Sequence, residues 1–195
     1  MTASLMIGDP KRFAIESYIK NAYEQPGLLA WGYFVIYLNG KCYGVRERDA
    51  TLLACSFGAV EDRIACRGKH VVPFSSVPNP VEIADAYRRI EYTGEHDPEE
   101  LFFGLSAKQF SSAVSKGKIS WAPDGDEAFD DGSYVLQMDI GDRVRLIGFT
   151  SQESHKETLQ SVSEYWMSAE EYYKILSEWR DRFLAEWAAA PKEMT

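Results

Sequence analysis

The chain has 195 residues, of which 45% are hydrophobic and 13% are aromatic. Burial of that much apolar surface offsets the entropy lost on ordering, so the composition excludes an intrinsically disordered protein. The 21 Lys and Arg side chains against 30 Asp and Glu give a formal charge of -9 at pH 7. This balance argues against direct nucleic-acid binding, which requires an excess of cations to neutralise phosphates.

The acidity is concentrated in the second half of the chain. Residues 91–195 carry 10 basic and 21 acidic side chains, a balance of -11, whereas residues 1–90 carry 11 basic and 9 acidic ones. The sequence therefore predicts a domain with one negative side.

The amino terminus shows no targeting or membrane segment. It lacks the basic start and apolar core of a secretory signal, and no run approaches the ~20 apolar residues of a membrane span. We therefore expect a cytoplasmic protein with no membrane partner.

The three cysteines, Cys42, Cys55 and Cys66, are odd in number and lie 13 and 11 residues apart. This spacing supplies neither a disulfide framework nor the paired cysteines of a zinc site. We expect three reduced thiols that serve as packing residues.

The first predicted elements are strands. Residues 12–20 alternate apolar and polar side chains, the pattern of a half-buried strand. Two further runs, residues 31–38 and 41–45, flank Asn39-Gly40. Because Asn-Gly supplies the positive φ angles of a tight turn, these runs predict a β-hairpin.

Three helices are predicted next. Four apolar residues at steps of four, three and four, from Leu53 to Ile64, form one face of a helix that Asp49 caps and Gly68 ends. A second helix has Asn79 as its N-cap with proline at the first helical position, and it runs to about residue 90. A third covers residues 106–117, with a Ser-x-x-Gln start and a glycine stop.

The remaining elements are a second hairpin, a further strand and a long helix. Residues 134–140 and 143–149 flank a Gly-Asp pair, and glycine at the first central position favours a type II′ turn. Residues 159–166 predict a strand, and a capping box at 168–171 opens the last helix. Its apolar seam consists of Tyr172, Leu176, Trp179, Phe183 and Trp187.

The order of elements is strands, helices, strands and a helix, without an internal repeat or linker. This order predicts an α+β fold: a mainly antiparallel sheet of hairpins with several helices and a long C-terminal helix. We expect one domain over residues 1–195.

Catalytic and metal-binding motifs are missing from the sequence. His70, His96 and His155 are far apart and form no His-Glu-x-x-His motif, and the phosphate-binding, dinucleotide and serine-elbow glycine motifs are absent. We therefore predict no catalytic residue, no metal ligand and no cofactor. A triad assembled from distant residues leaves no signature, so a small hydrolase using groups such as His96, Glu99 and Asp130 stays an alternative.

Two acidic stretches are the most unusual feature. The first contains Asp124, Asp126, Glu127, Asp130 and Asp131. The second begins with Glu91 and surrounds His96, and its candidate binding residues are Glu95, Asp97, Glu99 and Glu100. The first lacks the calcium-loop spacing of an EF-hand, because Ala128 and Phe129 stand where an oxygen ligand and a glycine belong. The stretches are either solvated loops or surfaces for a cationic partner, since concentrated like charge steers association.

Several short segments carry a family resemblance. In chain order they are IGDP (7–10), RFAIE (12–16), WGYF (31–34), WAP (121–123), FDDGS (129–133) and DIGDRVRLI (139–147). Together with the Asn39-Gly40 turn and the aromatic last helix, they resemble the immunity proteins of bacterial polymorphic toxin and contact-dependent growth inhibition systems, in particular the family numbered forty-two. The resemblance implies a cytoplasmic protein that binds and neutralises one toxin domain and has no catalytic residues.

The leading hypothesis is an inhibitor that occludes the active site of its cognate toxin domain. The acidic half favours a cationic nuclease as the toxin, because a nuclease needs a basic surface to hold phosphate. The candidate toxin-binding residues are nine acids of the two stretches, all of those named above except Glu91. The alternatives are the small hydrolase and an acidic adaptor that binds another basic protein.

Overall fold

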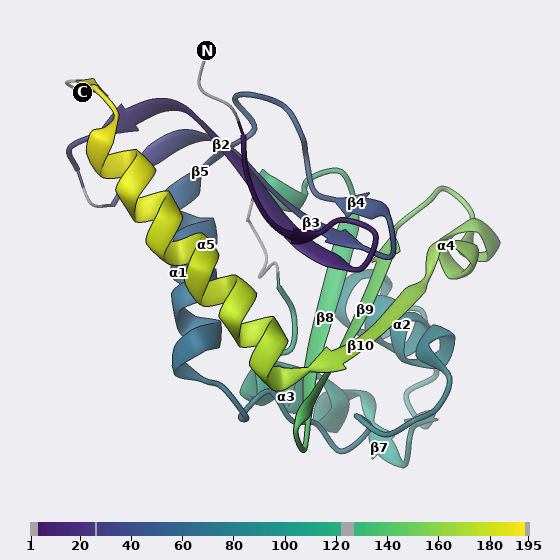
Figure 1. Ribbon diagram of the computed structural model, residues 1–195. Coiled ribbons are helices and arrows are strands. Elements are labelled where there is room, and N and C mark those ends of the chain that lie inside the picture. Colours follow the sequence, from purple (N-terminus) through teal and green to yellow (C-terminus); the bar gives the residue numbers. More distant parts are fainter. Residues whose placement is uncertain (1–3, 26, 122–126, 194–195) are drawn as a thin grey trace.

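The computed structural model describes residues 4–25, 27–121 and 127–193, and it combines antiparallel strands with helices (Figure 1). The strands are β1 (Leu5–Asp9), β2 (Phe13–Tyr23), β3 (Ala30–Leu38), β4 (Lys41–Tyr43), β5 (Thr51–Leu52), β6 (Leu101–Phe102), β7 (Leu105–Ser106), β8 (Ser133–Ile140), β9 (Arg143–Thr150), β10 (Ser163–Ser168) and β11 (Lys192–Glu193). The helices are α1 (Leu53–Ala65), α2 (Pro80–Arg88), the π-helix η1 (Arg89–Thr93), α3 (Ala107–Gly117), the 3-10 turn η2 (Glu127–Phe129), α4 (His155–Ser161) and α5 (Ala169–Ala189). The predicted α+β class is confirmed.

The first sheet has the strand order β1-β2-β3-β4, with β5 pairing to β3 and β11 to β2. All of these pairs are antiparallel except that of β11 with β2. The predicted hairpin is present: Leu38 pairs with Lys41, and Asn39 and Gly40 both have positive φ, at 51° and 78°. Two positive φ angles are what a type I′ turn requires.

Helix α5 covers one face of this sheet and lies beside α1 (Figure 1). Its predicted seam packs inward: Trp179 is fully buried, stacks on Phe183 at 5.0 Å and meets Phe34 of β3 edge-on at 5.1 Å. The indole also donates a hydrogen bond of 2.9 Å to Ser17 Oγ of β2. The helix begins after Ser168 as predicted, and Ser168 Oγ accepts from the Glu171 backbone N–H. The predicted capping box is only half formed, because the Glu171 carboxylate pairs with Arg12.

In the second sheet, β10-β9-β8, the strands β8 and β9 are buried on both faces. Because side chains alternate along a strand, Val135 and Leu146 join the core under α5, whereas Leu136 and Phe149 join a second core with α2 and α3. The β8–β9 turn is the predicted type II′, since of its two central residues Gly141 has the positive φ, 61°.

A buried polar network ties α1, β8 and α5 together. Arg63 of α1 donates to Gln137 Oε1 at 2.9 Å, and Tyr172 of α5 donates to the same oxygen at 2.6 Å. Tyr173 donates to Asp139 Oδ2 at 2.9 Å, and Gln137 Nε2 donates to Asp139 Oδ1 at 3.1 Å. Because these hydrogen bonds join side chains of three elements in one buried network, they fix how α1 and α5 sit against β8.

Two of the predicted element boundaries are wrong. Helix α1 begins at Leu53 without a side-chain cap, because Asp49 instead pairs with Lys20 of β2 at 2.9 Å and residues 51–52 pair with β3. Residues 159–161 belong to α4 rather than to a strand, since Ser154 caps that helix and β10 starts at Ser163.

The helix ends also differ in detail. Helix α1 ends at Ala65, before Gly68, and the residue with positive φ after α3 is Lys118 rather than the glycine that precedes it.

The three cysteines are free thiols, but the prediction that all three serve as packing residues is wrong for Cys42 and Cys55. Cys42 and Cys55 are exposed and Cys66 is half-buried. Within the described residues, no helix is long and apolar enough to cross a bilayer.

We predict that Trp179→Ala destabilises the protein by about 3 to 5 kcal/mol, because it removes a buried aromatic side chain and leaves a cavity. Leu184→Ala on the same helix is the control; Leu184 is 36% exposed, so its loss should cost no more than about 0.5 kcal/mol. Urea unfolding of both variants measures the difference. A Trp179→Ala protein with wild-type stability and lost partner binding would show that the seam is an interface instead of a core.

Candidate functional site

The acidic stretch at residues 95–100 follows directly from the end of α2 and η1. The N-cap Asn79 accepts from the Val81 N–H and starts α2 as predicted. The π-helix η1 then ends at Gly94, whose φ of 65° turns the chain outward. Within the loop, Asp97 Oδ1 accepts from the Glu99 N–H at 2.9 Å, so the stretch has a defined backbone conformation.

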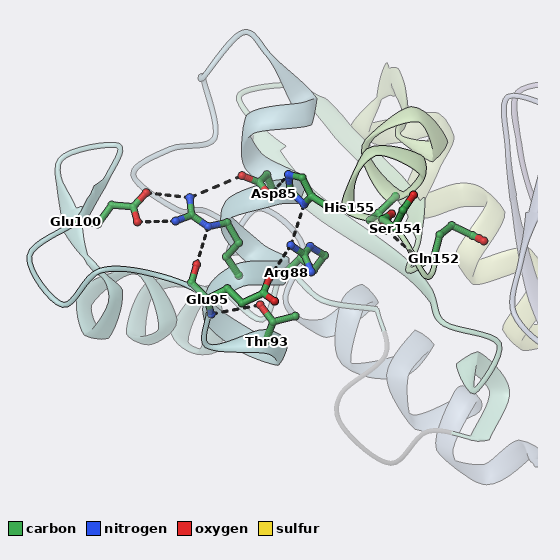
Figure 2. A network of polar contacts seen from close by, with 10 residues as sticks. Asp85, Arg88, Thr93, Glu95, Glu100, Gln152, Ser154 and His155 are labelled. Carbon is green, nitrogen blue, oxygen red and sulfur yellow. Dashed lines mark hydrogen bonds and ion pairs between the residues drawn. The ribbon is translucent and has the colours of Figure 1, made fainter.

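Two arginines at the end of α2 hold this loop in place (Figure 2). Arg88 donates to Glu95 Oε2 at 3.1 Å. Arg89 donates hydrogen bonds to both Glu100 carboxylate oxygens, at 2.8 and 2.5 Å, and to the Glu95 carbonyl at 2.9 Å. These hydrogen bonds from Arg89 lower the pKa of the Glu100 carboxyl. Glu100 is therefore engaged by Arg89 within the protein, whereas Glu95 pairs with Arg88 but keeps 65% of its side chain exposed.

Arg88 also connects the loop to α4 (Figure 2). Its guanidinium lies 2.8 Å from His155 Nδ1 at the start of α4. The Nε2 of the same ring lies 3.6 Å from Asp85 Oδ1. These contacts join α2, α4 and the acidic loop in one connected surface.

Asp97 and Glu99 differ from their acidic neighbours. Both side chains are exposed, and no ion pair between residues that the structure describes involves either of them. They are the exposed acids of this stretch that form no ion pair with another described residue.

The other acidic stretch is anchored elsewhere. Asp124 and Asp126 lie outside the described residues. Glu127 begins η2 and Asp130 follows it, and both are exposed. Asp131 accepts from the Ser133 N–H at 3.0 Å and from its hydroxyl at 2.9 Å, so this carboxylate shapes the turn into β8.

The two stretches pack on different elements. The η2 turn contacts β3 and β5 and accepts a hydrogen bond from the Val45 N–H, whereas residues 95–100 are held by α2. The hydrolase alternative needs a pocket that groups His96 with a carboxylate and a nucleophile. The His96 ring instead packs against Phe102, and its Nδ1 lies 3.3 Å from the Asp97 carbonyl. In the described part of the chain, no three His, Cys, Asp or Glu residues are grouped to hold a metal ion.

Sequence reasoning missed the residues that organise the acidic loop, namely Arg88, Arg89 and His155. The arginines at the end of α2 are cations at a helix C-terminus, which is favourable by itself. That signal does not tell which carboxylate each of them pairs with, because the partner residues come from a loop whose path the sequence leaves open.

The fold is similar to a solved immunity protein. The crystal structure of CdiI from Burkholderia dolosa AUO158 matches it with a TM-score of 0.53 and 16% identity, covering 91% of this chain and 99% of that one. At this identity the likeness shows a shared fold. None of the curated proteins matches this chain.

The family model for Immunity protein 42 matches residues 1–182, so the chain belongs to the immunity protein 42 family. It is an immunity protein, whose function is to bind and neutralise a toxin. The resemblance seen in the sequence is confirmed.

We predict that Glu100→Gln loosens the acidic loop, because the amide no longer forms the charged pair with Arg89. Amide hydrogen exchange in residues 95–100 should accelerate by about two- to fivefold, the range for a partly exposed ion pair. Glu99→Gln is the matched control and should leave exchange unchanged. Equal exchange in the two variants would mean that Arg89 does not hold the loop.

Proposed function

We propose that the toxin is a cationic nuclease and that this chain occludes its active site with the acidic surface. The observation that carries the proposal is the balance of -11 over residues 91–195, with Asp97 and Glu99 exposed on a loop of defined conformation. A nuclease holds a polyanion with a basic cleft. A surface of opposite charge both speeds encounter with that cleft and competes with the substrate for it.

The nine candidate residues differ in whether their carboxylates already accept hydrogen bonds from other side chains of the protein. Glu95, Glu100 and Asp131 already accept hydrogen bonds from neighbouring side chains, and breaking those contacts would cost binding energy. The exposed acids Asp97, Glu99, Glu127 and Asp130 carry the proposed contacts more readily. Asp124 and Asp126 remain candidates from the sequence.

The remaining parts of the proposal concern how and where the chain acts. It works as a stoichiometric inhibitor and not as an enzyme, and residues 1–195 act as one domain. The solved structure with the similar fold is a CdiI protein, which supports a role in contact-dependent growth inhibition. The chain would then act in the cytoplasm of the cell that it protects.

We predict that the double variant Asp97→Asn/Glu99→Gln associates with the toxin about 3- to 10-fold more slowly at low salt, because local charge steers the encounter. The control, Glu24→Gln/Glu47→Gln, removes two exposed acids from the first half of the chain and should slow association by less than about twofold. Stopped-flow mixing with the toxin encoded next to this chain gives both rates. The wild-type rate should also fall as salt rises and the Debye length shrinks from ~8 Å to ~3 Å.

Two results would contradict the proposal. A wild-type association rate that is flat from low to high salt would exclude steering. Full inhibition of a toxin that cleaves neither RNA nor DNA would exclude a nuclease as the target.

A further inference from the structure

A groove of about 300 Å³ lies between β1 and α5. On the strand, its lining residues are Met6, Ile7, Gly8 and Asp9. Because neighbouring side chains of a strand point to opposite faces, four consecutive lining residues place the groove along the edge of β1 rather than over one face. The helix contributes one stripe of side chains: Glu171, Lys174, Ile175, Glu178 and Arg182.

The outer edge of β1 is open to a further strand. β1 pairs with β2 and, among the described residues, with no other strand. Natural proteins usually block such an edge with lysine or proline, because its free N–H and C=O groups otherwise pair with another chain. β1 has the sequence LMIGD, which contains neither residue and whose charge is at its end. The edge is therefore ready to add a strand from a second molecule.

The charges of the α5 stripe alternate in sign along the helix. Glu171, Lys174, Glu178 and Arg182 give the order minus, plus, minus, plus. Among the described residues, Lys174 forms no ion pair, and the ion pair of Glu178 is with Arg182 at 3.9 Å. Lys174 and Glu178 are both exposed. The two central charges of the stripe are therefore available to a partner.

The other charged residues of the groove have partners within the chain. Arg12 pairs with Glu171 at 3.2 Å and donates to the Tyr165 hydroxyl at 2.7 Å. Asp9 accepts from the Lys11 N–H at 2.9 Å in the turn between β1 and β2. In total the groove is lined by three acids and three bases. With no net charge, it does not attract a cationic toxin by steering.

A second copy of this chain matches the pattern of the groove. A two-fold axis normal to the sheet places two copies of β1 antiparallel, edge to edge. Because α5 lies on one face of the sheet, the same axis sets the two copies of α5 antiparallel on that face.

In that arrangement the stripes of the two helices are complementary in charge. Lys174 of one copy faces Glu178 of the other copy, and Glu171 faces Arg182. Both pairs are centred on residues 176–177 of the helix, so one antiparallel register satisfies both. Each contact occurs twice, because in a two-fold interface residue i meets j and j meets i. All four contacts join opposite charges.

We propose that this groove is a dimer interface, in which two copies of the chain pair through the β1 edge and the α5 stripe. Met6, whose side chain is 36% exposed, and the half-buried Ile175 supply apolar contact between the charges. The inference goes beyond the proposed function and does not rest on it. The interface uses no residue of the acidic stretches.

Sedimentation of the full chain across a concentration series tests the assignment. We expect a species of twice the 22.1 kDa chain mass. Lys174→Glu and Glu178→Lys each place like charges opposite one another twice, so each should weaken dimerisation by about 10-fold or more. Glu170→Lys is the control, because it reverses an exposed charge of α5 outside the groove; it should leave the dimerisation constant unchanged.

Combining the two reversals gives a sharper test. The double variant Lys174→Glu/Glu178→Lys again places opposite charges across the axis, so its dimerisation constant should return to within about threefold of wild type. A mixture of the two single variants should form a heterodimer, because one copy then carries two acids where the other carries two bases. Neither result is expected if the single substitutions act by unfolding α5.

The β1 edge has a readout of its own. Dilution of the wild-type chain below its dimerisation constant should speed amide hydrogen exchange in β1, because the edge amides lose their partners, and should leave exchange in β9 unchanged. A dimer whose β1 exchange does not depend on concentration would show that the edge lies outside the interface.

Three further results would overturn the proposal. They are a wild-type chain that stays monomeric throughout the series, a dimer that neither single reversal weakens, and a monomer whose toxin binding falls in Lys174→Glu, which would make the groove a toxin contact. The variant Asp97→Asn/Glu99→Gln should dimerise as wild type does. Failure of charge steering and failure of this inference are therefore distinguishable.

Discussion

The arrangement of the whole protein depends on a guanidinium that is kept out of water. Arg63 is buried within α1 and is bonded to a glutamine of β8 and to two carbonyls that follow α3. Removing one partner of such a network leaves an uncompensated charge and costs several kcal/mol. The helices α1, α3 and α5 can therefore occupy few positions relative to β8 without breaking these bonds.

This junction lies between the core of the first sheet and α5 and the surface that we propose for toxin binding. On one side, the first sheet and α5 form a continuous aromatic core. On the other, α2 and η1 carry arginines that engage some acids of the 95–100 loop and leave others exposed. The groove between β1 and α5 lies on the first of these sides. Because α5 belongs to the buried network, this network also sets the position of the groove.

Local chemistry in the sequence predicted much of the fold. The Asn39-Gly40 turn, the Gly141 turn and the seam around Trp179 depend on neighbouring residues, and all three are confirmed. The cap at Asp49 was wrong because a distant lysine competes for its carboxylate. The candidate site at residues 95–100 was harder to predict, because a sequence shows where the acids are but does not show which arginines they pair with. The groove beside β1 was beyond prediction, since β1 and α5 meet only in three dimensions.

The claim that toxin binding occurs on the acidic surface is tested most directly by hydrogen–deuterium exchange of the chain with and without its toxin. We predict that binding protects amides in residues 95–100 and in η1, because these segments border the proposed contact. Exchange in β1 and along the outer face of α5 should stay unchanged. Protection confined to β1 and α5, with none at 95–100 or η1, would contradict the claim and place the interface on the opposite side of the molecule.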